Sequence, residues 1–154
     1  MRGFFHELEK EIQLAEGYSS RPYEDTADPP VATIGYGTTM IPGVGPVTLD
    51  TPQITPEDAL SWLRIDLYGA LIDCEKLFVN FNQLTPVRQQ VLANMAYNLG
   101  YSRLKGFKNM RAELDKPLNN IDYGMVAYHM LDSKWHKDRQ VGNRSKRLSL
   151  RMRA

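Results

Sequence analysis

The first apolar positions of the chain predict an amphipathic helix over residues 3–16. They recur at the spacing of one helical face: Phe5, Leu8, Ile12 and Ala15. The residues between them are mostly polar, and Gly17 follows directly, where a glycine commonly ends a helix. One face of this segment is therefore expected to be buried and the other to meet water.

The pattern changes over residues 18–50, where glycine and proline are frequent. Short β-prone pieces stand between them: Ala32-Thr33-Ile34, Tyr36 and Val47-Thr48-Leu49. Because glycine and proline break helices and favour turns, this stretch predicts a small region of strands and turns.

Helical spacing returns after residue 55. Thr55-Pro56 predicts the start of a helix over residues 56–79, since threonine is a good N-cap and proline suits the first helical position. Its apolar face includes Cys74, which we interpret as a buried core thiol. Thr85-Pro86 repeats the same start signal for a helix that ends at Gly100.

Shorter helices are expected over residues 107–115, 121–133 and 143–152, the last with Asn143 as its N-cap. The predicted fold class is therefore α+β, with a small mixed lobe, a long connecting helix and a larger helical lobe.

Composition narrows the class of protein. Of the 154 residues, 42% are hydrophobic and 24% are charged, which excludes a disordered or collagen-like chain. No apolar run is long enough for a transmembrane helix, and early acidic residues argue against a secretory signal. The single cysteine excludes an internal disulfide and indicates synthesis in a reducing cytosol.

The net charge of +1 conceals an uneven distribution. Residues 1–75 carry 13 acidic and 4 basic side chains, whereas residues 76–154 carry 5 acidic and 15 basic ones. Residues 134–154 hold 8 basic residues and a single acid, Asp138. This asymmetry indicates either an anionic polymer as partner or substrate, or a solvated basic helix.

Motifs for metals, cofactors and covalent catalysis are missing from the sequence. His6, His129 and His136 have no partner at metal-ligand spacing. The glycines match neither a dinucleotide fingerprint nor a phosphate-binding loop, and no Gly-x-Ser-x-Gly is present. We therefore expect no metal and no cofactor.

Paired carboxylates are the remaining candidates for chemistry. Glu16 closes the first predicted helix, where the negative end of the helix dipole disfavours an ionised side chain. Asp25 follows in a polar loop, where it should stay solvated and ionised. Hydrolysis of a glycosidic bond needs one protonated and one ionised carboxyl group. The spacing alone does not separate this role from two solvated surface residues, which are common.

Further motifs give these carboxylates a context. Along the chain they are Ala15-Glu16-Gly17, Pro22-Tyr23-Glu24-Asp25-Thr26, Thr33-Ile34-Gly35-Tyr36-Gly37, Asn94 to Gly100, Gly106-Phe107, Ser133-Lys134-Trp135 and Asn143-Arg144-Ser145-Lys146-Arg147. In content and in order, these motifs resemble the phage-type lysozymes of glycoside hydrolase family 24. The resemblance implies one lysozyme domain over residues 1–154. Its parts would be a mixed lobe over residues 12–55, a connecting helix over 56–79 and a helical lobe over 80–154, on which helix 3–16 packs.

The resemblance also implies residue roles. Glu16 would be the general acid, Asp25 would hold or deprotonate the attacking water, and Thr33 would help to place that water. Because the family inverts the anomeric centre, the two carboxyl groups are expected about 6.5–9.5 Å apart. Asn94 would line or support the cleft. Arg144 would contact the acid across it, and its charge would oppose the effect of the helix dipole on Glu16.

Two departures from the family pattern fall in this region. The segment from Asp25 to Thr33 is two residues longer than in the family's best-known member, which makes Asp28 a rival for the base. The eight-residue gap after Glu16 favours Asp25. Thr38 follows Gly37 where many members carry histidine, so we expect no histidine-dependent ion pair in this lobe.

The tryptophans Trp62 and Trp135 are interpreted as packing residues, with Trp135 in the core or beneath the cleft, in preference to sugar-stacking platforms.

The implied function is that of an endolysin, an N-acetylmuramidase that hydrolyses the β-1,4 bond of bacterial peptidoglycan. It would be made in the host cytoplasm and reach the wall through a separate membrane lesion, as a monomer without nucleic-acid partner or stable membrane insertion. One alternative keeps the chemistry in a virion-associated, wall-piercing lysozyme. Another, of a different class, is a catalytically silent cationic module that binds wall or nucleic acid.

Overall fold

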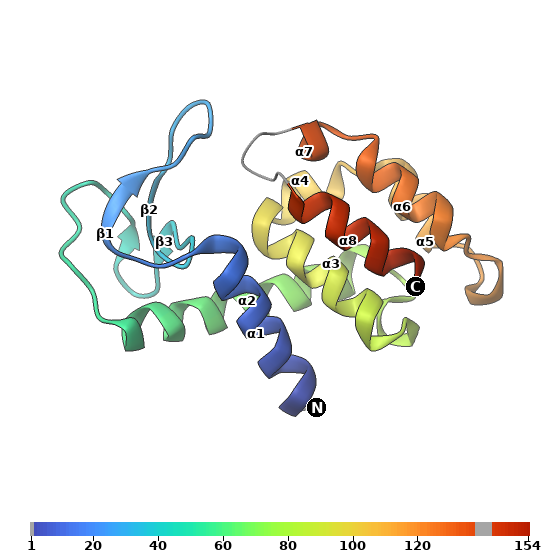
Figure 1. The fold of residues 1–154 in the computed structure, drawn as a ribbon, viewed down its shortest axis with the longest axis horizontal. Coiled ribbons are helices and arrows are strands. Elements are labelled where there is room, and N and C mark those ends of the chain that lie inside the picture. Colours follow the sequence, from blue (N-terminus) through green and yellow to red (C-terminus); the bar gives the residue numbers. More distant parts are fainter. Residues whose placement is uncertain (1, 138–142) are drawn as a thin grey trace. The chain divides into compact units, whose positions relative to one another are not determined.

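The computed structural model describes residues 2–137 and 143–154 (Figure 1). Contacts divide the chain into two compact units, Met1–Tyr68 and Gly69–Ala154, here called unit 1 and unit 2. The boundary falls inside the long helix α2, Pro56–Leu77. Helices and short strands both occur, which confirms the α+β class. No described helix is long and apolar enough to cross a membrane.

Unit 1 contains α1 (Arg2–Glu16), short strands and the first part of α2. The strands are β1 (Ser19–Glu24), β2 (Ala32–Gly35), β3 (Met40–Ile41) and β4 (Gly45–Pro46). They form antiparallel pairs, β1 with β2 and β3 with β4. A small apolar cluster of Ile34, Ile41 and Val47 lies against Trp62, so Trp62 is a packing residue as predicted.

Two side-chain contacts tie α1 to α2 within unit 1. The guanidinium of Arg64 donates to the carboxylate of Glu9, which is buried. The ring of Phe5 stacks on Tyr68 with the ring centroids 4.8 Å apart. Both contacts join residues far apart in the sequence. The predicted packing of helix 3–16 on the helical lobe stays a prediction.

The strand predictions were partly wrong. Ala32–Ile34 lies in β2 as expected, but Tyr36 lies in a turn, because the chain reverses there and Ile34 pairs with Thr38. The piece from Val47 to Leu49 is not a strand, since Thr48 closes a turn with Thr51 through backbone and hydroxyl hydrogen bonds. Val47 itself follows β4 directly: its backbone N–H donates to the Thr39 carbonyl at 2.9 Å, and its side chain is buried in the apolar cluster.

Strand β1 lies inside the predicted strand-and-turn region but was not itself predicted, because its proline and glutamate are disfavoured in strands. Its extended conformation is stabilised by pairing with β2.

Unit 2 is helical. Its described elements are the rest of α2, α3 (Pro86–Leu99), α4 (Tyr101–Lys105), α5 (Lys108–Leu114), α6 (Tyr123–Leu131), α7 (Lys134–Lys137), α8 (Asn143–Arg153) and the 3-10 turns Phe81–Gln83 and Leu118–Asn120. The predicted start of α3 is confirmed, since the Thr85 hydroxyl accepts a hydrogen bond from the backbone N–H of Arg88. Helix α8 packs along α6 and α3 (Figure 1).

The core of unit 2 includes Cys74 and Trp135, both buried as predicted. Burial raises the pKa of the Cys74 thiol, which leaves it protonated and unreactive. The sequence pattern missed α4 and α7, because a helix of one turn is too short to show a period. Asp138 and Arg139 of the predicted basic segment lie outside the described residues.

Candidate functional site

Glu16 is the last residue of α1. The helix ends there with Gly17 at φ 71°, whose N–H donates to the carbonyl of Gln13 at 3.0 Å. The Glu16 carboxyl lies against Gly37: a Cβ built on that glycine would stand 3.0 Å from Oε2 and 3.2 Å from Cδ. The missing side chain of Gly37 therefore provides the space that the carboxyl occupies.

Asp25 follows β1 at the neck of the loop over residues 25–31. Its Oδ1 accepts hydrogen bonds from the backbone N–H groups of Ala27, at 3.1 Å, and Val31, at 2.8 Å. The backbone N–H of Asp25 donates to the Val31 carbonyl at 3.0 Å. One carboxylate oxygen is thus held by the loop, and the side chain has a fixed orientation.

Thr33 lies in β2 and is only 4% exposed. Its hydroxyl donates to the carbonyl of Val31 at 3.1 Å, the same carbonyl that accepts from the Asp25 backbone. The structure therefore brings Asp25 and Thr33 together, through the backbone of Val31.

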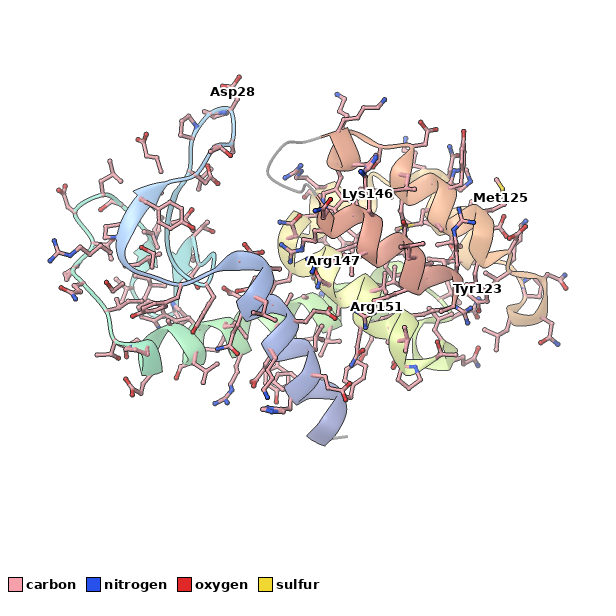
Figure 2. The ribbon with its side chains drawn as sticks, in the orientation of Figure 1. Asp28, Tyr123, Met125, Lys146, Arg147 and Arg151 are labelled. Atoms are coloured by element: carbon pink, nitrogen blue, oxygen red, sulfur yellow. The ribbon has the colours of Figure 1, made fainter. Side chains whose placement is uncertain are left out.

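Asp28 lies at the tip of the same loop, away from its neck (Figure 2). Its side chain is exposed, and no hydrogen bond joins its carboxyl to another described residue. Of the two candidates for the base, Asp25 is the one that the fold holds in position.

Burial and the charges of both carboxyl groups affect the pKa of the Tyr23 phenol. Burial raises this pKa, and the negative charges of Glu16 and Asp25 raise it further. Because such effects act over short distances, both carboxyl groups lie within electrostatic reach of one hydroxyl. Sequence reasoning did not assign Tyr23 to the site. Its strand pairing with Thr33 would have indicated it, had β1 been predicted.

Thr38 and Asp66 form a second polar contact in unit 1. The Thr38 hydroxyl donates to Oδ2 of Asp66 at 3.4 Å, and Thr38 itself is fully buried. Burial raises the pKa of Asp66 to about 6, while the hydrogen bond from Thr38 opposes that rise. The partner of the Asp66 carboxyl is thus the neutral hydroxyl of Thr38, at the position where many family members carry a histidine.

Asn94 and Arg144 meet inside unit 2. Arg144 Nε donates to Asn94 Oδ1 at 2.7 Å, and both side chains are buried. Arg151 Nη2 likewise donates a hydrogen bond to Gln90 Oε1 at 2.9 Å. Two basic residues of α8 are therefore bonded to α3. Lys146 and Arg147 are exposed on α8 (Figure 2). The predicted contact of Arg144 with the acid stays a prediction.

Unit 2 also contains a pocket of about 360 Å³. Its described lining includes the positively charged residues Arg103, Lys108 and Lys134 and the aromatic rings of Phe107 and Trp135. Asp132 is the carboxylate residue among the described lining. The pocket therefore offers no pair of carboxyl groups. No group of three potential metal ligands occurs among residues 2–137 and 143–154.

These features define the class of protein. A unit with short antiparallel strand pairs, followed by a helical unit, is a lysozyme-like α+β fold. The sequence model of the Phage lysozyme family matches residues 13–154, nearly the whole chain. The chain therefore belongs to the phage lysozyme family, a family of lysozyme-type hydrolases with peptidoglycan as substrate. A comparison with curated proteins found no match.

Proposed function

We propose that this chain is an N-acetylmuramidase that cleaves the β-1,4 bond between N-acetylmuramic acid and N-acetylglucosamine with inversion. The observation that supports the proposal is that unit 1 holds two carboxyl groups in fixed surroundings: Glu16 lies against Gly37, and Asp25 accepts two backbone hydrogen bonds beside Thr33. This acid–base reaction requires two carboxyl groups.

Glu16 is the general acid in this proposal. Its proton passes to the glycosidic oxygen as the bond from that oxygen to the anomeric carbon breaks. Gly37 supports this role, because it leaves the carboxyl room to lie against the backbone. Arg144, which is held by Asn94 in unit 2, is a supporting residue in this proposal.

Asp25 is the base, and Thr33 is its positioning partner. A water molecule attacks the anomeric carbon from the face opposite the leaving oxygen, and its proton passes to Asp25. Oδ1 of Asp25 is engaged by two backbone N–H groups, which leaves Oδ2 to take the proton. Both carboxyl groups return to their starting states by exchanging protons with solvent.

The acid is tested by a turbidity assay on purified peptidoglycan. Wild-type protein should clear the suspension, and Glu16→Gln should fold normally but lose about 1,000-fold or more in rate, since the amide cannot supply the proton. Glu7→Gln, on the exposed part of α1, is the matched control and should keep full activity. Clearing by Glu16→Gln at the wild-type rate would remove Glu16 from the mechanism.

The base is tested by a pair of substitutions in one loop. Asp25→Asn should lower kcat by about 100-fold or more, because the amide cannot accept the proton from water. Asp28→Asn should change kcat by less than about twofold, since Asp28 lies at the loop tip. The reverse ranking would move the base to Asp28.

Product analysis distinguishes hydrolysis from lytic transglycosylation, which cleaves the same bond without adding water. Hydrolysis leaves reducing muramic acid ends on the digested glycan. A lytic transglycosylase on a similar fold would leave anhydro-muramic ends, and their appearance would contradict the role given to water.

We infer that the biological role is release of phage from the host, as an endolysin made in the cytoplasm. The same chemistry on the virion would serve entry, and immunodetection in purified particles separates the two roles. Lysis of the host by a chain absent from particles supports the endolysin.

A further inference from the structure

Two tyrosines form a pair of rings on the surface of unit 1. The ring centroids of Tyr18 and Tyr36 are 5.5 Å apart, with 47° between the ring planes. Tyr18 is 43% exposed and Tyr36 is half-buried, so the pair presents aromatic surface to water.

The pair lies beside the proposed acid. Tyr18 follows Glu16 by two residues, directly after the glycine that ends α1. Tyr36 precedes Gly37, whose backbone lies against the Glu16 carboxyl. Each ring is therefore carried by a segment that also positions the acid.

We propose that Tyr18 and Tyr36 form a stacking platform for a pyranose ring of the glycan strand, next to the bond being cleaved. The inference rests on the proposed function, which supplies the glycan as the occupant. The axial C–H bonds of a β-linked pyranose form a flat apolar face that aromatic rings remove from water. The sugar hydroxyl groups, and the hydroxyl of tyrosine, stay at the edge where water reaches them.

The platform explains why aromatic side chains remain exposed at this point. A planar ring binds the face of a sugar with few rotatable bonds to immobilise, which favours tyrosine over aliphatic residues. Packing between α1 and the turn at Tyr36 would need apolar bulk but no plane. Substitutions that keep bulk and remove the plane therefore separate the two roles.

The test measures KM and kcat on glycan strands from which the stem peptides have been removed. Tyr18→Phe keeps the ring and should stay within about twofold of wild type. Tyr18→Ala and Tyr18→Leu should each raise KM about tenfold with kcat within about twofold, because they lose binding shared by ground state and transition state. Tyr128→Ala, an exposed tyrosine of α6, is the matched control and should leave KM unchanged.

Binding is measured separately in the Glu16→Gln background with the same peptide-free strands. Adding Tyr18→Ala should raise the dissociation constant about tenfold, and adding Tyr18→Phe should leave it unchanged. A Leu variant with wild-type KM and affinity would overturn the platform while the hydrolase stands. Strands that bind in a Tyr18-dependent way but are not cut by the wild type would support the platform and overturn the proposed function.

Discussion

At the residue scale, Gly37 leaves room for the Glu16 carboxyl because it has no side chain. Gly37→Ala would place a methyl group 3.0 Å from the Glu16 carboxyl and strain a backbone with φ 80°. Since the end of the Glu16 side chain is flexible, the carboxyl should move and the fold should persist. We expect kcat to fall about 100-fold, as for a displaced catalytic group, and stability to fall by about 1–2 kcal/mol.

Gly43→Ala is the control for this prediction. Gly43 has a similar φ of 73°, but nothing lies within 4 Å of a Cβ built there. The two variants should therefore lose similar free energies of unfolding in urea, while only Gly37→Ala loses activity on peptidoglycan. Equal activities would show that the glycine does not position Glu16.

Asp66 should make the stability of the protein depend on pH. Its raised pKa of about 6 means that the folded state binds a proton that the unfolded state, with a pKa of 3.8, has released. This contribution to stability is fully present below about pH 4 and is lost as the pH rises through about 6. The carboxyl is partly exposed, so we expect about 1 kcal/mol in place of the 3 kcal/mol that a buried group would give.

Asp66→Asn tests this by keeping an acceptor for the Thr38 hydroxyl without the charge. The melting temperature of the variant should exceed that of wild type at pH 8 and converge with it near pH 4. Asp50→Asn, at an exposed position, should track the wild type at both values. A wild-type advantage at pH 8 would mean that the ionised carboxyl stabilises the fold.

At the element scale, Arg88 joins three helices of unit 2. From the first turn of α3 its Nε donates to the Met152 carbonyl at 2.9 Å, and Nη2 donates to the Ala154 carbonyl at 2.6 Å. Its guanidinium carbon lies 3.4 Å from the centroid of the Tyr123 ring in α6. Arg88 thereby bonds one carbonyl in the last turn of α8 and one just after it, at the end of the helix where intrahelical partners are lacking.

Arg88→Ala should therefore lower the free energy of unfolding by about 1–3 kcal/mol, measured by urea denaturation. Arg103→Ala, at an exposed position of α4, should change it by less than about 0.5 kcal/mol. Equal effects of the two substitutions would show that the contacts of Arg88 with α6 and α8 add no stability.

The sequence predicted helices of several turns better than helices of one turn. The long helices α1, α2 and α3 were predicted to within about two residues, because several turns repeat the same apolar spacing and the caps are local. The one-turn helices α4 and α7 have no such repeat. Strand β1 is extended because it pairs with β2, and the strand propensities of its own residues contain no information about that partner.

At the scale of the whole molecule, the charge asymmetry follows the two units. Unit 1 comprises most of the acidic first half, and unit 2 comprises the basic second half. Part of the positive charge is used internally, since Arg144 and Arg151 bind α3. Lys146 and Arg147 remain exposed on α8, so fewer cations of this helix are available to an anionic wall than its composition suggests.

The sequence alone was sufficient for the fold class, the family motifs and the position of Glu16, because helix signals and motifs are local. The spacing from Glu16 already favoured Asp25 over Asp28 as the base, and the tertiary structure adds the backbone N–H groups that hold the Asp25 carboxylate. It also paired Tyr23 with Thr33, paired Tyr18 with Tyr36 and set Thr38 against Asp66. Each of these contacts depends on how strands and turns pair across the fold, which no local pattern encodes.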